Sequence, residues 1–301
     1  MREKKRNITL AERADRHRLY ELSVQYAASE IEFVDQTFRR LRGRKARRLR
    51  EDFCGTANIC CEWLRQRKGN RAVGVDIDRE VLQWGIENNL SRLSREQRGR
   101  VSLLREDVLK VKGAPPDIVS AMNFSYWLFK ERTQLRRYFK RVHASLADDG
   151  FFFLDAYGGY DAYKEIVEER EIEGEAFTYI WEQAHYNPID GNLLCHIHFA
   201  FDDGSRLEKA FSYDWRLWNL TEIRELLREE GFPGSPPTGR GGTRTGSRTA
   251  ALNRRWWRTR MPDGSVTSAR KNSPEGVFHN RPAWCAINAV LADNSSEQLH
   301  L

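Results

Sequence analysis

Short apolar runs alternate with amphipathic stretches along the first 232 residues of the 301-residue chain. Five of these runs are strand candidates, and the last of them is apolar at consecutive positions, as expected of a strand that is buried on both faces. They lie at residues 49–53, 71–76, 101–104, 117–122 and 151–154. The regular alternation of strand and helix predicts an α/β fold, with a parallel sheet and helices on both of its faces.

The helices are indicated by apolar spacing and by capping residues. Residues 12–42 present one apolar side and are expected to form one or two helices, and residues 57–67 form a further helix. Asp78 is a suitable N-cap for the helix after the second strand. The clearest periodicity lies between the fourth and fifth strands, at Leu135, Tyr138, Phe139, Val142 and Leu146.

The pattern changes after the fifth strand. Turn sequences at 188–192 (Pro-Ile-Asp-Gly-Asn) and 202–204 (Asp-Asp-Gly) separate two or three longer strands. A helix over 221–230 then restores the periodicity of the main domain. We therefore expect an antiparallel β-hairpin insertion at 177–213 within a domain that spans residues 46–232.

Most of the positive charge lies in residues 233–282. This segment holds nine Arg and one Lys against Asp263 and Glu275, while the formal net charge of the whole chain is +7. The preceding residues are close to neutral, so they do not form a protein-wide basic face for nucleic acid. The composition is typical of a disordered segment, and a reading-frame error in the gene would produce the same abrupt change. Residues 283–301 contain a last strand candidate and a tail.

Composition bounds the class of protein. Hydrophobic residues make up 40% of the chain, which is ample for a core. The five cysteines follow neither disulfide nor metal-ligand spacing, as is usual in a reducing compartment. We see no signal peptide after Met1 and no apolar stretch near the roughly 18 residues of a membrane span. We therefore expect a cytoplasmic protein that does not enter a membrane.

Polar residues follow four of the predicted strands in an order that indicates a nucleotide-like ligand. Glu51 belongs to the acidic pair at the end of the first strand and Gly55 to the turn after it, where a glycine lets the backbone approach a ligand next to free N–H groups of a helix start. Asp76 lies 21 residues beyond Gly55, where a carboxylate can bind ribose hydroxyls. Asp107 after the third strand can accept from an adenine amino group, and Asn123 ends the fourth strand beside the expected crevice.

This order of features resembles the class I S-adenosylmethionine-dependent methyltransferases over about residues 15–232. The motifs that carry the resemblance are LREDFCGTA, VGVDID, REDV and YDWRLWNLTEIRELL, and they are similar to a bacterial branch without an assigned substrate. The resemblance implies a Rossmann-like methyltransferase sheet and S-adenosyl-L-methionine as the cofactor. It assigns Glu51 and Gly55 to the first motif, Asp76 to the ribose, Asp107 to the adenine and Asn123 to the methionine end. Three residues next to these complete the predicted cofactor set: Cys54, Ile77 and Val108.

The first motif departs from the family pattern, because Phe53, Gly55 and Ala57 stand at its three glycine places. A nicotinamide cofactor is the rival interpretation, since Asp76 would serve its ribose equally well. That cofactor needs a second mononucleotide-binding half and a Gly-rich pyrophosphate loop, which the sequence does not supply. We therefore prefer S-adenosyl-L-methionine.

Methyl transfer needs alignment and exclusion of water, and no metal or nucleophilic triad is expected. Asp155 and Tyr157 follow the fifth strand and are the candidate catalytic residues, as proton acceptor or hydrogen-bond partner of the substrate. The alternative for Asp155 is that it caps the next segment. We interpret residues 1–45 as an N-terminal helical lid in which 20–25 cover the donor, or else as helices packed on the sheet edge.

The acceptor is not identified by any motif. Four aromatic residues in and after the insertion form either a substrate pocket or core: Trp181, Tyr186, Trp215 and Trp218. His196 and His198 share a strand face, but two histidines without a third ligand do not predict a metal. A small-molecule substrate is favoured. The alternatives are a nucleic-acid or protein methyltransferase anchored by the Arg-rich segment, and a module that binds the cofactor without turnover.

Overall fold

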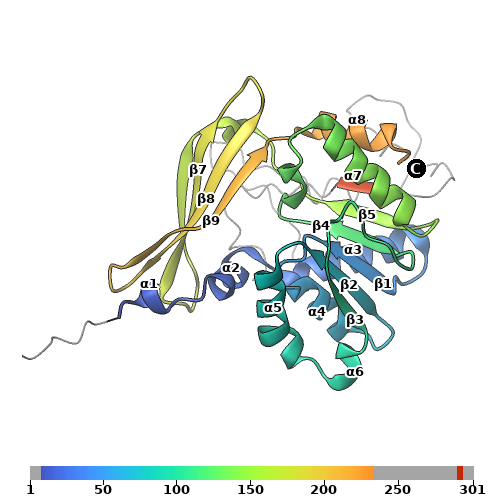
Figure 1. Cartoon of the computed structure of the whole chain (residues 1–301), viewed down its shortest axis with the longest axis horizontal. Helices are drawn as coiled ribbons and strands as arrows, with labels where there is room; N and C mark the ends of the chain where they lie inside the picture. Colours follow the sequence, from blue (N-terminus) through green and yellow to red (C-terminus); the bar gives the residue numbers. More distant parts are fainter. Residues whose placement is uncertain (1–7, 233–289, 294–301) are drawn as a thin grey trace, which may run out of the picture.

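The computed structural model describes residues 8–232 and 290–293, which form two sheets and the helices around them (Figure 1). The predicted basic segment, 233–282, lies outside the described residues, and so does most of 283–301. Among the helices that the structure describes, none combines the length and the apolar character needed to span a membrane.

The larger sheet has the predicted parallel core. Its strands lie in the order β10-β5-β4-β1-β2-β3, and neighbouring strands from β1 to β5 are parallel. Their bounds are β1 Arg48–Asp52, β2 Arg71–Asp76, β3 Val101–Arg105, β4 Ile118–Ala121 and β5 Phe151–Leu154. Strand β10 (Val290–Asp293), which overlaps the last strand candidate, pairs antiparallel with β5. The α/β fold class is confirmed.

Both faces of this sheet are buried, as the consecutive apolar residues of the fifth strand predict. Phe151 and Phe153 of β5 belong to one core cluster and Phe152 and Leu154 to the other, because successive side chains of a strand point to opposite faces. The first cluster includes residues of α3 (Ala27–Arg42), α4 (Asn58–Gln66) and α5 (Arg79–Asn88). The second includes residues of α7 (Arg132–Ser145) and α8 (Leu220–Glu229).

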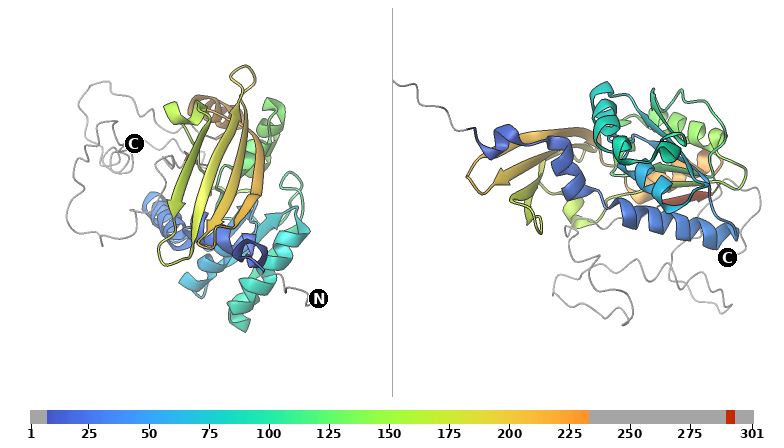
Figure 2. Two further views of the ribbon diagram at one scale, coloured as in Figure 1. Left: turned by 90° about the vertical axis from the view of Figure 1, so that its left-hand side faces the viewer. Right: turned by 90° about the horizontal axis from the view of Figure 1, so that it is seen from below.

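The insertion forms a second sheet of four antiparallel strands, β6-β7-β8-β9, which extends away from the first (Figures 1 and 2). Its strands are β6 Ile166–Glu171, β7 Phe177–Tyr186, β8 Asn192–Phe201 and β9 Arg206–Arg216. The sequence predicts two or three strands over 177–213, so β6 is an addition. It was missed because charged residues at Glu168 and Arg170 occupy its half-buried positions, leaving little apolar alternation.

Residues 12–42 form two helices, α2 (Arg16–Val24) and α3, within the predicted one or two, and a short α1 (Leu10–Arg13) precedes them. Asp15 separates α1 from α2, because its carboxylate accepts from the backbone N–H groups of His17 and Arg18 and so caps α2. Helix α1 contacts the β8–β9 turn, where the Leu10 N–H donates to Asp203 at 2.8 Å. Figure 2 shows α1 beside the tip of the antiparallel sheet and α3 along the parallel one.

Four short helices complete the described chain and connect the larger elements. They are η1 (Leu90–Arg92), α6 (Arg95–Arg98), η2 (Ser125–Leu128) and η3 (Tyr160–Tyr163). The last two follow β4 and β5, at the edge of the parallel sheet that faces the second sheet (Figure 1). This carboxyl edge is where open α/β sheets bind ligands.

Candidate active site

The turn after β1 keeps a glycine-like path although two of its three glycine places hold other residues. Phe53, Gly55 and Ala57 all have left-handed φ angles, at 59°, 51° and 57°. A non-glycine residue in this region is strained by about 1–2 kcal/mol. At Phe53 this strain is offset by packing of the ring, whose centroid lies 5.6 Å from that of Tyr138 and 6.1 Å from that of Phe129. The departure from the family motif therefore changes the side chains of the turn and keeps its backbone conformation.

A close approach of α5 to this turn fixes its position. Gly85 of α5 lies so near that a Cβ atom there would stand 2.4 Å from the carbonyl oxygen of Thr56. No side chain fits at that distance, so only glycine permits the contact. Cys54 is buried against the second strand, where its N–H donates to the Val75 carbonyl at 3.0 Å.

Glu51 lies at the end of β1 and is almost wholly buried. Its carboxylate accepts from the backbone N–H of Cys60 in the first turn of α4, at 3.1 Å. Burial raises its pKa from 4.5 to about 8. At neutral pH the group is therefore mostly a neutral carboxyl, which can both donate and accept a hydrogen bond.

Asp76 joins the first two predicted motifs. One of its carboxylate oxygens accepts from the Gly55 N–H at 2.8 Å and the other from the Asp78 N–H at 3.0 Å. A carboxylate offers about four acceptor positions, so acceptor capacity remains for a hydroxyl of a ligand. Ile77 follows with 71% of its surface exposed, an apolar side chain on the same edge.

The residues after β3 divide between surface and core. The Asp107 carboxylate accepts from the Leu109 N–H at 2.9 Å and stays partly exposed. Val108 is buried in the core cluster. Of Asp107 and Val108, Asp107 is therefore the one whose polar atoms reach the surface.

Asn123 and Phe124 form an unusual turn at the end of β4, both with left-handed φ angles of 58° and 56°. Their backbone N–H groups each donate to the Asp155 carboxylate at 2.8 Å, one to each oxygen. Asp155 is only 1% exposed, and burial raises its pKa from 3.8 to about 7. Tyr126 adds a third link through its hydroxyl, which donates to the Asp155 carbonyl at 2.6 Å. Asp155 thus holds the turn that presents Asn123.

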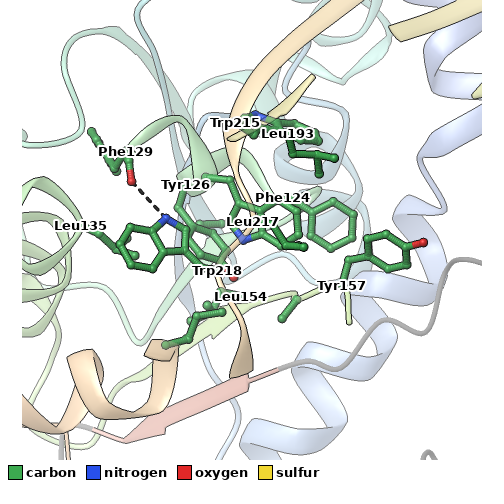
Figure 3. Packing of buried hydrophobic residues seen from close by; sticks show 14 of the residues in the cluster. Phe124, Tyr126, Phe129, Leu135, Leu154, Tyr157, Leu193, Trp215, Leu217 and Trp218 are labelled. Atoms are coloured by element: carbon green, nitrogen blue, oxygen red, sulfur yellow. Dashed lines mark hydrogen bonds between the residues drawn. The ribbon is translucent and has the colours of Figure 1, made fainter. Parts of the chain in front are cut away.

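Tyr157, the second candidate catalytic residue, is buried beside this turn. Its ring centroid lies 6.2 Å from that of Phe124, and the same Phe124 ring contacts Trp215 of β9 at 6.2 Å (Figure 3). The two sheets therefore meet at the Asn123–Phe124 turn.

One functional candidate escaped the sequence analysis. Glu21 of α2 is buried, and its carboxylate accepts from the Thr56 hydroxyl and from the Asn89 side chain, both at 2.6 Å. It fastens the N-terminal helices to the turn after β1. Glu21 lies within residues 20–25, the segment predicted to cover the donor, but its partners are 35 and 68 positions away and no sequence pattern indicates them.

The aromatic residues of the insertion divide into separate groups. Trp181 and Trp215 lie 6.4 Å apart on one face of the second sheet, next to the Phe124 turn. Trp218 is core: its indole N–H donates to the Phe129 carbonyl at 3.1 Å (Figure 3). Tyr186 instead contacts Tyr163 of η3.

The two histidines of β8 lie on the opposite face of that sheet from Trp181, as their pairing positions show. His196 contacts the Ser212 hydroxyl at 2.8 Å, and His198 lies between the carboxylates of Glu182 and Glu208. Within residues 8–232 and 290–293 no group of three or more His, Cys, Asp or Glu side chains has the geometry of a metal site.

No family model matches the sequence, and no curated protein matches it either. Solved structures do match. A S-adenosylmethionine-dependent methyltransferase from Clostridium acetobutylicum is 17% identical, with a TM-score of 0.57, over 72% of this chain and 86% of that one. An amino pentose methyltransferase of calicheamicin biosynthesis from Micromonospora echinaspora is 14% identical, with a TM-score of 0.57, over 71% and 87%.

A sugar N-methyltransferase from Streptoalloteichus sp. is 17% identical, with a TM-score of 0.56, over 73% of this chain and 85% of that one. These identities are too low to transfer an activity, but the coverage includes most of both chains. The chain therefore has the fold of the class I S-adenosylmethionine-dependent methyltransferases.

Proposed function

We propose that the protein is a methyltransferase that binds S-adenosyl-L-methionine at the carboxyl edge of the parallel sheet. The observation that carries the proposal is the contact between Gly55 and Asp76. These residues are 21 positions apart in the sequence, and the carboxylate accepts directly from the glycine N–H. A ribose-binding acid is thereby fixed beside a turn whose backbone can approach a ligand.

The other cofactor residues fit the same orientation. Asp107 and the exposed Ile77 suit the adenine end, where a polar acceptor and an apolar wall are both needed. Asn123, on the turn held by Asp155, suits the methionine end. Glu51, buried under the first turn of α4, supports that turn.

The reaction would be an in-line displacement. S-adenosyl-L-methionine would supply an electrophilic methyl group, and S-adenosylhomocysteine would remain once the acceptor has taken that group and lost a proton. The protein contributes alignment and exclusion of water.

Tyr157 and the Asn123–Phe124 turn are next to the predicted methionine end and would orient the acceptor. Asp155 acts on the acceptor through this turn, since both of its carboxylate oxygens already accept from backbone N–H groups. We propose it as a positioning residue.

A small molecule is the proposed acceptor. The antiparallel sheet and α2 flank the carboxyl edge, as contacts of Trp215 with Phe124 and of Glu21 with Thr56 show, which suits a compact substrate better than a polymer. Two of the similar structures carry the names of an amino pentose and a sugar methyltransferase. The nucleic-acid alternative depends on the basic segment outside the described residues.

The test is calorimetric titration of the full chain with S-adenosylmethionine. We expect micromolar binding that is lost in Asp76→Ala, because the ribose then lacks its acceptor. Asp148→Ala, an exposed carboxylate in the turn between α7 and β5, is the matched control and should bind as the wild type does. A folded wild-type protein that binds no donor, or an Asp76→Ala variant that binds normally, overturns the proposal.

A further inference from the structure

The face of the antiparallel sheet that carries Trp181 also carries two polar residues. Glu168 of β6 lies directly opposite Trp181, and Gln183 lies two positions further along β7. Side chains opposite each other in antiparallel strands share a face, and the next alternate position lies within reach of a long side chain. Glu168, Trp181 and Gln183 therefore form one cluster, which we call the inner cluster.

Both polar residues of the inner cluster have a buried oxygen that lacks a hydrogen-bond donor. Oε2 of Glu168 and Oε1 of Gln183 accept from no residue that the structure describes. The Gln183 amide is only 1% exposed, and its orientation is set because its nitrogen donates to the carbonyls of Asp161 and Lys164, at 3.0 and 2.6 Å. A buried acceptor without a donor is destabilising, so such groups are rare and need an explanation.

The nearby cations are engaged elsewhere. Arg170, the next residue on this face of β6, donates to the Tyr26 hydroxyl at 2.9 Å and to the Ser23 carbonyl. Lys164 pairs with the Asp161 side chain at 2.7 Å. Burial and, after it, the nearby Asp161 carboxylate raise the pKa of Glu168, so the surroundings of this carboxylate favour a positive partner.

The inner cluster is linked to the carboxyl edge. Trp181 contacts Trp215, and Trp215 contacts Phe124 of the turn that presents Asn123. Helix α2 also covers this face of the sheet, since the ring centroids of Tyr20 and of Phe211 in β9 are 5.0 Å apart. A group bound at the cluster therefore lies between the second sheet, the N-terminal helices and the proposed donor site.

We propose that Glu168 and Gln183 bind an amine of the methyl acceptor, with Trp181 beside them, so that the substrate class is an amine on a small apolar or flat body. An ammonium group supplies up to three donors and one positive charge, which matches two unpaired acceptors of which one is a carboxylate. An indole next to the carboxylate adds a cation–π contact. This inference rests on the proposed function for its link to methyl transfer, but the binding itself is measured separately.

The test uses phenethylamine as a cationic probe and 2-phenylethanol as its neutral counterpart. Both are titrated into the full chain with S-adenosylhomocysteine present, and tryptophan fluorescence reports binding. We expect the amine to bind at least about tenfold more tightly than the alcohol, because a hydrogen bond to a charged group adds to a cation–π contact. In Glu168→Gln the amine should lose this preference.

Glu169→Gln is the matched control, since Glu169 is exposed on the other face of the same strand. It should leave amine binding unchanged, and neither variant should alter calorimetric binding of S-adenosylmethionine. Equal binding of amine and alcohol to the wild type, or a Glu168→Gln variant that keeps the preference, overturns the inference. If the folded wild-type protein binds no S-adenosylmethionine, that result contradicts the proposed function instead. The amine titration is therefore repeated without S-adenosylhomocysteine, and this repeat tests amine binding independently of the proposed function.

Discussion

The carboxyl edge of the parallel sheet and the inner cluster of the antiparallel sheet both bury carboxylates, and they differ in what binds them. At the carboxyl edge, Asp155 accepts from two backbone N–H groups and Asp76 from two more. In the inner cluster, Glu168 and Gln183 each keep a buried oxygen that accepts from no donor among residues 8–232 and 290–293. Internal hydrogen bonds fix geometry before a ligand arrives, whereas unpaired acceptors are expected where a ligand supplies the donors.

The difference matches the two roles that we propose. A cofactor is the same in every turnover, so a site that is already organised binds it without paying for rearrangement. An acceptor must be distinguished from other small molecules, and buried polar groups that only the correct substrate satisfies discriminate strongly. If these roles are correct, removing the charge of Asp155 should lower stability, whereas removing that of Glu168 should lower amine binding and leave stability intact.

The largest effect is expected for Asp155→Asn. The amide offers one acceptor and one donor, so one of the two backbone N–H groups of the turn is left facing another donor. A buried unpaired donor is destabilising by about 1–3 kcal/mol, and we expect a loss near the upper end in the free energy of unfolding from urea denaturation.

Asp190→Asn is the matched control for this change, because Asp190 lies in the exposed β7–β8 turn. Donor affinity should fall together with stability in Asp155→Asn, since Asn123 is presented by the same turn. Full stability in this variant would mean that the carboxylate does not organise the turn.

The carboxyl edge could be predicted from sequence because its residues follow strands directly. Once a run is recognised as a parallel strand, a polar residue at its end or just after it must lie at the carboxyl edge, which places Asp76, Asp107 and Asn123 without knowledge of packing. The contact of Gly55 with Asp76 follows from the neighbouring positions of β1 and β2. What the sequence did not show is the double anchoring of Asp155, because this depends on the left-handed turn at Asn123–Phe124.

The inner cluster could not be predicted in the same way. Glu168 belongs to β6, a strand that has almost no apolar signature, and its partner Trp181 is identified only by the pairing of β6 with β7. Trp181 alone suggested either a pocket or core. Glu21 illustrates the same limit, because its contacts with Thr56 and Asn89 join residues 35 and 68 positions apart.

A smaller effect is expected in the pH dependence of stability, and Glu51→Gln isolates it. The pKa of Glu51 is about 8 in the folded protein against 4.5 without burial, so the folded state binds the proton more tightly. Its contribution to stability is therefore complete below about pH 4.5 and is lost as the pH rises toward 8. Asp155 has a pKa of about 7 in the folded protein, so its contribution to stability is also lost as the pH rises, but at a lower pH than that of Glu51.

Urea denaturation between about pH 5 and pH 8 measures this dependence, and the interval above pH 7 belongs mainly to Glu51. We expect the wild-type stability to fall across that interval and the Glu51→Gln variant to lose the upper part of the fall. Glu32→Gln, an exposed change on α3, should follow the wild-type curve. Identical curves for Glu51→Gln and the wild type would contradict a neutral buried carboxyl at the first motif.

The smallest effect, and the one that separates the two regions most sharply, is expected for the stability of Glu168→Gln without ligand. Replacing a carboxylate by an amide destabilises the turn at Asp155. At Glu168 the same replacement should leave the free energy of unfolding unchanged or raise it by up to about 1 kcal/mol. No hydrogen bond within the described residues is lost there, and a partly buried charge is removed. Thermal denaturation without any amine measures it, with Glu169→Gln as the reference. A marked loss of stability would show that Glu168 already has a partner within the protein, and its role in binding an amine would then have to be abandoned. A neutral or stabilising result beside a loss of amine binding is the behaviour of a residue retained for its ligand, since such residues trade stability for function.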